Sequence, residues 1–125
     1  MRTKEDFKNK IHLIISALIV GPIAFIYGFQ PELLFEVNIT TPNQYNVFKA
    51  IMGLYLGFAI VWILGVSKPK YYKIALVSNM VFMLGLGLGR LLSMGVDGLP
   101  SALFVWGTLG ELLIGFYGLW VYKRK

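Results

Sequence analysis

Four long apolar stretches constrain what this chain can fold into. They cover roughly Ile11–Phe29, Val47–Val66, Ile74–Gly95 and Ala102–Tyr122. Each is close to the ~20 residues that a helix needs to cross about 30 Å of hydrocarbon. Only 14% of the residues are charged, whereas a soluble domain carries about 25%. The sequence therefore predicts an all-α integral membrane four-helix bundle, with residues 1–125 forming a single four-span transmembrane domain.

The basic residues predict how this bundle is oriented. Apart from Lys49 and Arg90, they lie in residues 1–10, in the loop 67–73 and in residues 123–125. Four spans place these three segments on one side, which the positive-inside rule assigns to the cytoplasm. We therefore expect a multi-pass protein of the inner cell membrane with cytoplasmic N- and C-termini. Basic residues beside spans favour contact with the lipid bilayer rather than with nucleic acid, despite the net charge of +6.

Aromatic and small residues give expectations about the ends and the packing of the spans. We expect aromatic side chains near the span ends to lie at the membrane interfaces: Tyr27, Tyr45, Tyr71, Tyr72, Trp106, Trp120 and Tyr122. GxxxG pairs in spans two and three, which let helix backbones approach closely, are expected to pack against neighbouring helices: Gly53 with Gly57, and Gly85 with Gly89.

Three charged residues lie inside the apolar spans: Lys49, Arg90 and Glu111. Glu111 lies near the middle of span four, and Arg90 lies in span three. Spans three and four run in opposite directions, and helical side chains lean toward the N-terminus of their helix, so the two should converge. We predict a direct Arg90–Glu111 ion pair, because an isolated charge in hydrocarbon is costly. Lys49 is a candidate third member, although it can also reach the outer interface.

The helical period places more polar residues beside Arg90. Asn79, Ser93 and Asp97 project onto the same face of span three. The predicted buried polar cluster, which is also the candidate ligand-binding site, consists of Arg90, Glu111, Lys49, Asn79, Ser93 and Asp97. Three roles remain open: to fix the register of spans three and four, to line a ligand cavity, or to couple to a proton or an ion.

The sequence offers little for metal or acid–base chemistry. It has no cysteine and a single histidine, His12, which we expect at the cytoplasmic interface. A thiolate site or a protein-only zinc site is therefore not predicted, and no cofactor is expected. Glu111 has no second carboxylate within the spans, so no catalytic residue is assigned.

Three segments carry a resemblance to a known family. They are YNVFKAIMGLYLG in span two, GRLLSMGVDGLPS after span three, and GELLIGFYGL in span four. The chain resembles an uncharacterised bacterial family of small four-helix membrane proteins, catalogued as a domain of unknown function, and is more distantly similar to DoxX-type proteins. The marker residues carried over are Arg90, Asp97, Gly98, Pro100 and Glu111. Lys49 departs from the arginine that such sequences often carry, and lysine lacks the planar fork for bidentate pairing.

These observations leave three classes of function. The first is an accessory or interaction module that binds another membrane protein or forms a homo-oligomer. The alternative is binding or transport of a small amphiphile or anion in an outward-facing intramembrane pocket at Arg90 and Glu111. An enzyme acting on a lipid is the weakest of the three, because only one buried acid is present.

Overall fold

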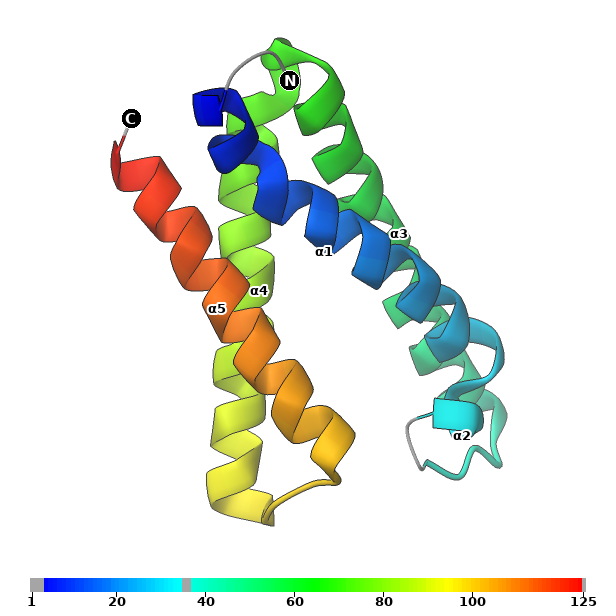
Figure 1. Cartoon of the computed structure of the whole chain (residues 1–125). Coiled ribbons are helices and arrows are strands. Elements are labelled where there is room, and N and C mark those ends of the chain that lie inside the picture. Colours follow the sequence, from blue (N-terminus) through cyan, green and yellow to red (C-terminus); the bar gives the residue numbers. More distant parts are fainter. Residues whose placement is uncertain (1–3, 35–36, 125) are drawn as a thin grey trace.

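The computed structural model describes residues 4–34 and 37–124. Its elements are α1 (Lys4–Phe29), α2 (Pro31–Leu34), α3 (Pro42–Ser67), the 3-10 turn η1 (Pro69–Tyr71), α4 (Tyr72–Asp97) and α5 (Ala102–Arg124) (Figure 1). The described residues form no strand. The prediction of an all-α fold with four long apolar helices is confirmed, since α1, α3, α4 and α5 are each long and apolar enough to cross a membrane. Each long helix also extends beyond its apolar core into flanking polar residues.

Local signals in the sequence explain where the helices start and stop. The hydroxyl of Thr41 accepts from the backbone N–H of Gln44, whose side chain reaches back to Thr41, so that α3 starts with a capping box. Pro42 follows at the first helical position, where no N–H is needed. At the end of α4, Gly98 adopts a φ of 102°, a conformation that L side chains rarely adopt.

The four long helices form two pairs that separate toward one end of the molecule. α1 packs extensively on α3, α4 packs extensively on α5, and α3 joins the pairs through α4. The start of α1 and the end of α5 lie at the end shown at the top of Figure 1. We call this the basic end, and the end formed by α2 and the α4–α5 loop the distal end. That the basic end faces the cytoplasm stays a prediction from charge.

The packed core contains an aromatic cluster between α3 and α4. Trp62 is fully buried, and its ring lies 5.0 Å from that of Phe82. Its Nε1 donates to Ser78 Oγ at 3.2 Å, which satisfies the polar atom of this large side chain. Tyr55 packs on Phe82 at 5.1 Å between ring centroids. These contacts hold the two helix pairs together along the α3–α4 interface.

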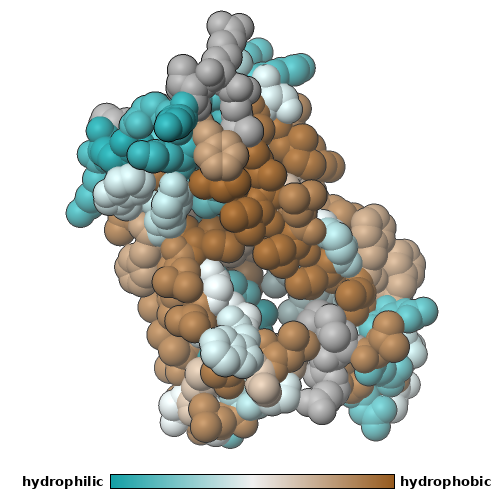
Figure 2. Space-filling model, in the orientation of Figure 1, coloured by the Kyte–Doolittle hydropathy of each residue, from teal (hydrophilic) through white to brown (hydrophobic). Residues whose placement is uncertain are grey.

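The outer surface of the long helices is apolar. Large hydrophobic side chains such as Leu18, Val81 and Leu92 are 70%, 67% and 68% exposed. The space-filling view shows these hydrophobic surfaces between hydrophilic regions near the two ends (Figure 2). An apolar belt of this kind is stable when lipid covers it.

The expected GxxxG contacts are not present in the described part of the chain. A Cβ placed on Gly53, Gly57, Gly85 or Gly89 would meet no atom within 4 Å, so the prediction that these pairs pack against neighbouring helices of this chain is wrong. Close approaches occur elsewhere, as at Gly65, where a Cβ would overlap that of Ala75. Spacing identifies a small-residue face, but it does not say whether a helix of the same chain covers that face.

Candidate functional site

Arg90 and Glu111 form the predicted ion pair. Arg90 Nε donates to Glu111 Oε1 at 2.9 Å, joining α4 to α5. The side chains are 24% and 16% exposed, so both charges are largely buried inside the bundle. Antiparallel α4 and α5 bring the two side chains together from opposite directions, as their lean toward the helix N-termini predicts.

Tyr27 also contacts the ion pair. Arg90 Nη2 donates to the Tyr27 hydroxyl at 3.4 Å, so the guanidinium bridges the α4/α5 pair to α1. Tyr27 is 9% exposed and lies edge-on to Tyr55, with ring centroids 5.2 Å apart. The expectation that Tyr27 is an interfacial aromatic is wrong. Its spacing of three, seven and eleven residues from the buried Ala24, Val20 and Ser16 was the signal for an inward position.

The ion pair leaves hydrogen-bonding capacity unused. Among the described residues, Nη1 of Arg90 finds no acceptor and Oε2 of Glu111 no donor. The guanidinium carbon also lies 5.5 Å from the centroid of the Phe104 ring. A guanidinium has five N–H donors and a carboxylate can accept at both oxygens, so the pair can bind a further polar group without separating.

A cavity of about 340 Å³ lies beside the ion pair. All four long helices contribute to its wall, which is polar at Ser16, Tyr27, Tyr55, Arg90 and Glu111. The rest of the wall is made of aliphatic, aromatic, methionine and glycine residues: Ile19, Val20, Ile23, Met83, Leu86, Leu103, Phe104, Trp106, Gly107, Gly110 and Ile114. A few polar groups in a largely apolar wall of this size are typical of sites for small ligands.

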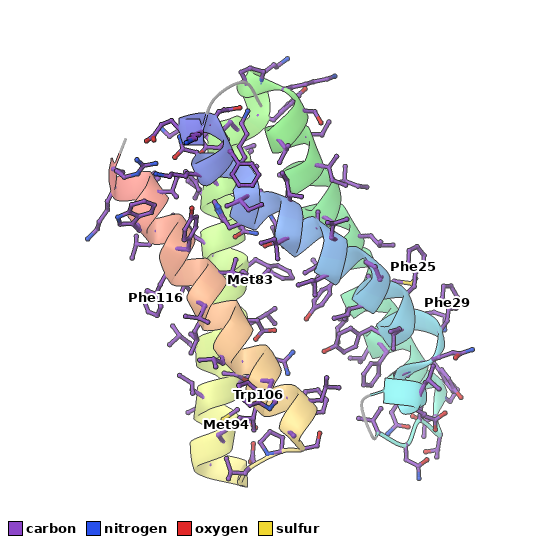
Figure 3. The ribbon with its side chains drawn as sticks, in the orientation of Figure 1. Phe25, Phe29, Met83, Met94, Trp106 and Phe116 are labelled. Carbon is purple, nitrogen blue, oxygen red and sulfur yellow. The ribbon has the colours of Figure 1, made fainter. Side chains whose placement is uncertain are left out.

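The cavity occupies the region where the helix pairs separate. Met83 points from α4 into the space between the pairs, and Trp106 lies on the distal half of α5, whereas Phe25, Phe29 and Phe116 point away from the bundle (Figure 3). Figure 2 shows the same face hollowed between the distal half of α5 and α1. Trp106 is 70% exposed, so part of the cavity wall is accessible from outside the bundle.

The structure separates Lys49 from the ion pair. Lys49 Nζ donates to the backbone carbonyl of Gly28 at 3.0 Å and lies 5.4 Å from the ring centroids of Phe29 and Tyr45. The prediction that Lys49 joins the cluster is wrong. Its side chain instead satisfies a carbonyl at the C-terminal end of α1, where a cation also complements the helix dipole.

The other predicted cluster residues lie at different depths. Asn79 is fully buried, and neither side-chain polar atom has a partner among the described residues. Ser93 donates to Asp97 Oδ2 at 2.8 Å in an exposed contact on α4. Residues that share a helix face can lie far apart along the axis, about 27 Å for an eighteen-residue separation. The predicted six-residue cluster is therefore not one site. Arg90 pairs with Glu111 and Ser93 with Asp97, while Lys49 and Asn79 bond to no other member among the described residues.

His12 lies in the interior rather than at the interface expected from the sequence. It is 3% exposed, and both ring nitrogens lack a partner among the described residues. Its ring centroid is 5.3 Å from that of Tyr117, and its backbone carbonyl accepts from Ser16 Oγ at 2.7 Å. In the described part of the chain, no three His, Cys, Asp or Glu side chains are grouped so that they could hold a metal ion.

These features define the class as a multi-pass four-helix membrane protein with an ion pair in the wall of an apolar cavity. The chain belongs to the family described as Domain of unknown function (DUF4345), which matches residues 9–122. No curated protein and no solved structure matches the chain. The expected family membership is thus confirmed, while the bacterial source and the likeness to DoxX-type proteins stay predictions.

Proposed function

We propose that the protein binds a small amphiphile in the cavity beside Arg90 and Glu111. The observation that carries this proposal is that a largely buried ion pair lies in the wall of a largely apolar cavity. A pair that only fixed the register of α4 and α5 would need no space beside it. With the basic end in the cytoplasm, the cavity faces the outer half of an inner cell membrane.

The atoms of the ion pair that have no partner indicate which polar head group the amphiphile carries. Arg90 Nη1 offers N–H donors and Glu111 Oε2 offers an acceptor. A hydroxyl-bearing head group can accept from the first and donate to the second, so both charges are satisfied at once. A carboxylate head can use only Arg90 and places a second negative charge beside Glu111. The pocket therefore favours an uncharged hydroxyl head over an anion.

The apolar wall specifies the tail and its route of entry. The cavity extends from Arg90 toward Ser16 along α1, past Ile23 and Val20. Exposed residues of α5 at the cavity mouth, including Trp106 and Leu103, allow a ligand to enter sideways from the bilayer between α1 and α5. An alkyl chain entering this way exchanges lipid for the apolar cavity wall without crossing water.

Photolabelling tests this proposal. The probe is a fatty alcohol with a diazirine in its chain, added to proteoliposomes of the purified protein. We expect cross-links to peptides of α1 and α5 that line the cavity. Ile23→Trp fills the cavity and should abolish these cross-links, whereas Leu18→Trp, on the exposed face of the same helix, should retain them. Equal labelling of the two variants and the wild type would refute binding in the cavity.

A second function, docking of another membrane helix, is favoured by one observation. Among the described residues, no side chain fills the space beside four glycines: Gly53, Gly57, Gly85 and Gly89. Such positions let a further helix approach closely, as in a homo-oligomer. Gly53→Leu with Gly57→Leu should then reduce the oligomer mass measured in neutral detergent. An oligomer mass equal to that of the wild type would exclude α3 as the contact between the helices.

A further inference from the structure

A second hollow lies at the basic end, remote from the Arg90–Glu111 cavity. Its volume is about 500 Å³, and its wall consists of Tyr72, Lys73, Leu76, Tyr122 and Lys123. Tyr72 and Lys73 belong to the first turn of α4, and Tyr122 and Lys123 to the last turn of α5. The antiparallel packing of these helices therefore brings two lysines and two tyrosines to one site near the end of the apolar span.

Unlike Lys10 and Arg124 at the same end, the two lysines have no acidic partner among the described residues. Lys10 Nζ pairs with Asp6 at 3.1 Å, and Arg124 pairs with Glu5. Among the described residues, Lys73 and Lys123 form no ion pair, hydrogen bond or ring contact. The nearby acids are thus engaged elsewhere, and the hollow keeps the positive charge of both ammonium groups.

The position of the hollow favours an anion that is attached to the membrane. Leu76, its innermost residue, is 2% exposed, while Ile74 and Trp120 on the same two helices are 61% and 49% exposed. Acyl chains can cover these exposed apolar side chains while a head group lies between the lysines. The positive dipole end of α4 is offset by the negative end of α5, so the attraction for an anion comes from the two lysines. Basic pockets between helices at this depth suit phosphate head groups.

We propose that the hollow lined by Lys73 and Lys123 binds the phosphate group of an anionic phospholipid. The two ammonium groups neutralise the phosphate, and the Tyr122 hydroxyl, on a side chain that is 43% exposed, can donate to a phosphate oxygen. This site is independent of the proposed amphiphile cavity, because the two share no lining residue.

Native mass spectrometry of the purified protein in neutral detergent tests the proposal. Phosphatidylglycerol and phosphatidylcholine are titrated separately, and inorganic phosphate is added as a competitor. Each lysine contributes about fivefold in affinity for an anionic lipid at a membrane surface. We therefore expect Lys73→Gln with Lys123→Gln to weaken phosphatidylglycerol binding roughly 25-fold, with little change for phosphatidylcholine.

The matched control is Lys68→Gln with Lys70→Gln, which removes the same charge at the same end but outside the hollow. It should keep the preference for phosphatidylglycerol to within about twofold. Lys73→Arg with Lys123→Arg keeps the charge and should retain binding, which separates loss of the site from loss of folding. An equal loss in both Gln variants would overturn the proposal, as would displacement of the lipid by millimolar inorganic phosphate, which would assign the site to free phosphate.

Discussion

The two ends of this bundle are built differently from the same four helices. At the basic end, helices contact one another closely: Gly65 meets Ala75, and Gly118 lies against His12 and Met80. At the distal end, the helix pairs separate and a cavity replaces backbone contact, with Arg90 reaching across it to Tyr27. Small residues thus bring the two helix pairs together at the basic end, while long polar side chains link the pairs at the distal end. The difference teaches that the distal end has room for an apolar ligand between the two helix pairs, so that binding there does not require the fold to unpack.

The largest expected effect comes from breaking the ion pair of the distal end. Arg90→Met alone leaves the Glu111 carboxylate buried without its partner, which should cost about 3–5 kcal/mol of unfolding free energy. Arg90→Met with Glu111→Leu removes both charges and should restore most of that loss. Reversible unfolding in mixed micelles measures all three forms. If the single variant were as stable as the wild type, the distal pair would not hold the helices as described.

The next effect tests close packing at the basic end. Gly65→Ala places a Cβ where that of Ala75 already lies, so overpacking should cost about 1–3 kcal/mol. Gly53→Ala on the same helix meets nothing within 4 Å and should be neutral or stabilising by up to about 1 kcal/mol. The melting temperature of each variant in detergent gives the comparison. Equal destabilisation by the two substitutions would show that Gly65 is no more closely packed than Gly53.

A smaller effect is expected from the contact that crosses the cavity. Tyr27→Phe removes the hydroxyl that accepts from Arg90 and should cost about 0.5–1.5 kcal/mol. Tyr45→Phe is the control, because Tyr45 is 45% exposed and should change stability by less than about 0.5 kcal/mol. Unfolding of both variants under the same conditions provides the measurement. A Tyr27→Phe variant no different from its control would show that the hydroxyl does not link the helix pairs.

The smallest effect is expected where the predicted polar stripe is not part of the site. Among the described residues, the Ser93 hydroxyl bonds only to Asp97, in an exposed contact. Ser93→Ala should therefore alter the unfolding free energy by less than about 0.5 kcal/mol. Photolabelling by the diazirine alcohol should also stay at the wild-type level. Loss of labelling in this variant would extend the site toward the distal end of α4.

The sequence predicted the parts of this structure that depend on local pattern and helix direction. Apolar runs gave the four long helices, and the opposite directions of spans three and four brought Arg90 to Glu111. The depth of a side chain in the bundle and the helix it faces were harder to predict, because a periodic pattern defines a helix face but not which helix covers that face. Tyr27 lay near a predicted span end and was assigned to the interface, yet its ring packs on Tyr55 of α3 and its hydroxyl meets Arg90 of α4, which buries it. The cavity depends on how far the two helix pairs separate, which no residue pattern specifies.

A crystal structure of the wild-type protein grown in a lipid phase that contains a fatty alcohol tests the central claim most directly. We predict ordered density for an alkyl chain beside Ile23 and Met83, with its hydroxyl within hydrogen-bonding distance of Arg90 Nη1 and Glu111 Oε2. The contrary result is a distal end in which α1 and α5 close over the Arg90–Glu111 pair with no ligand beside it. The ion pair would then be a purely structural contact.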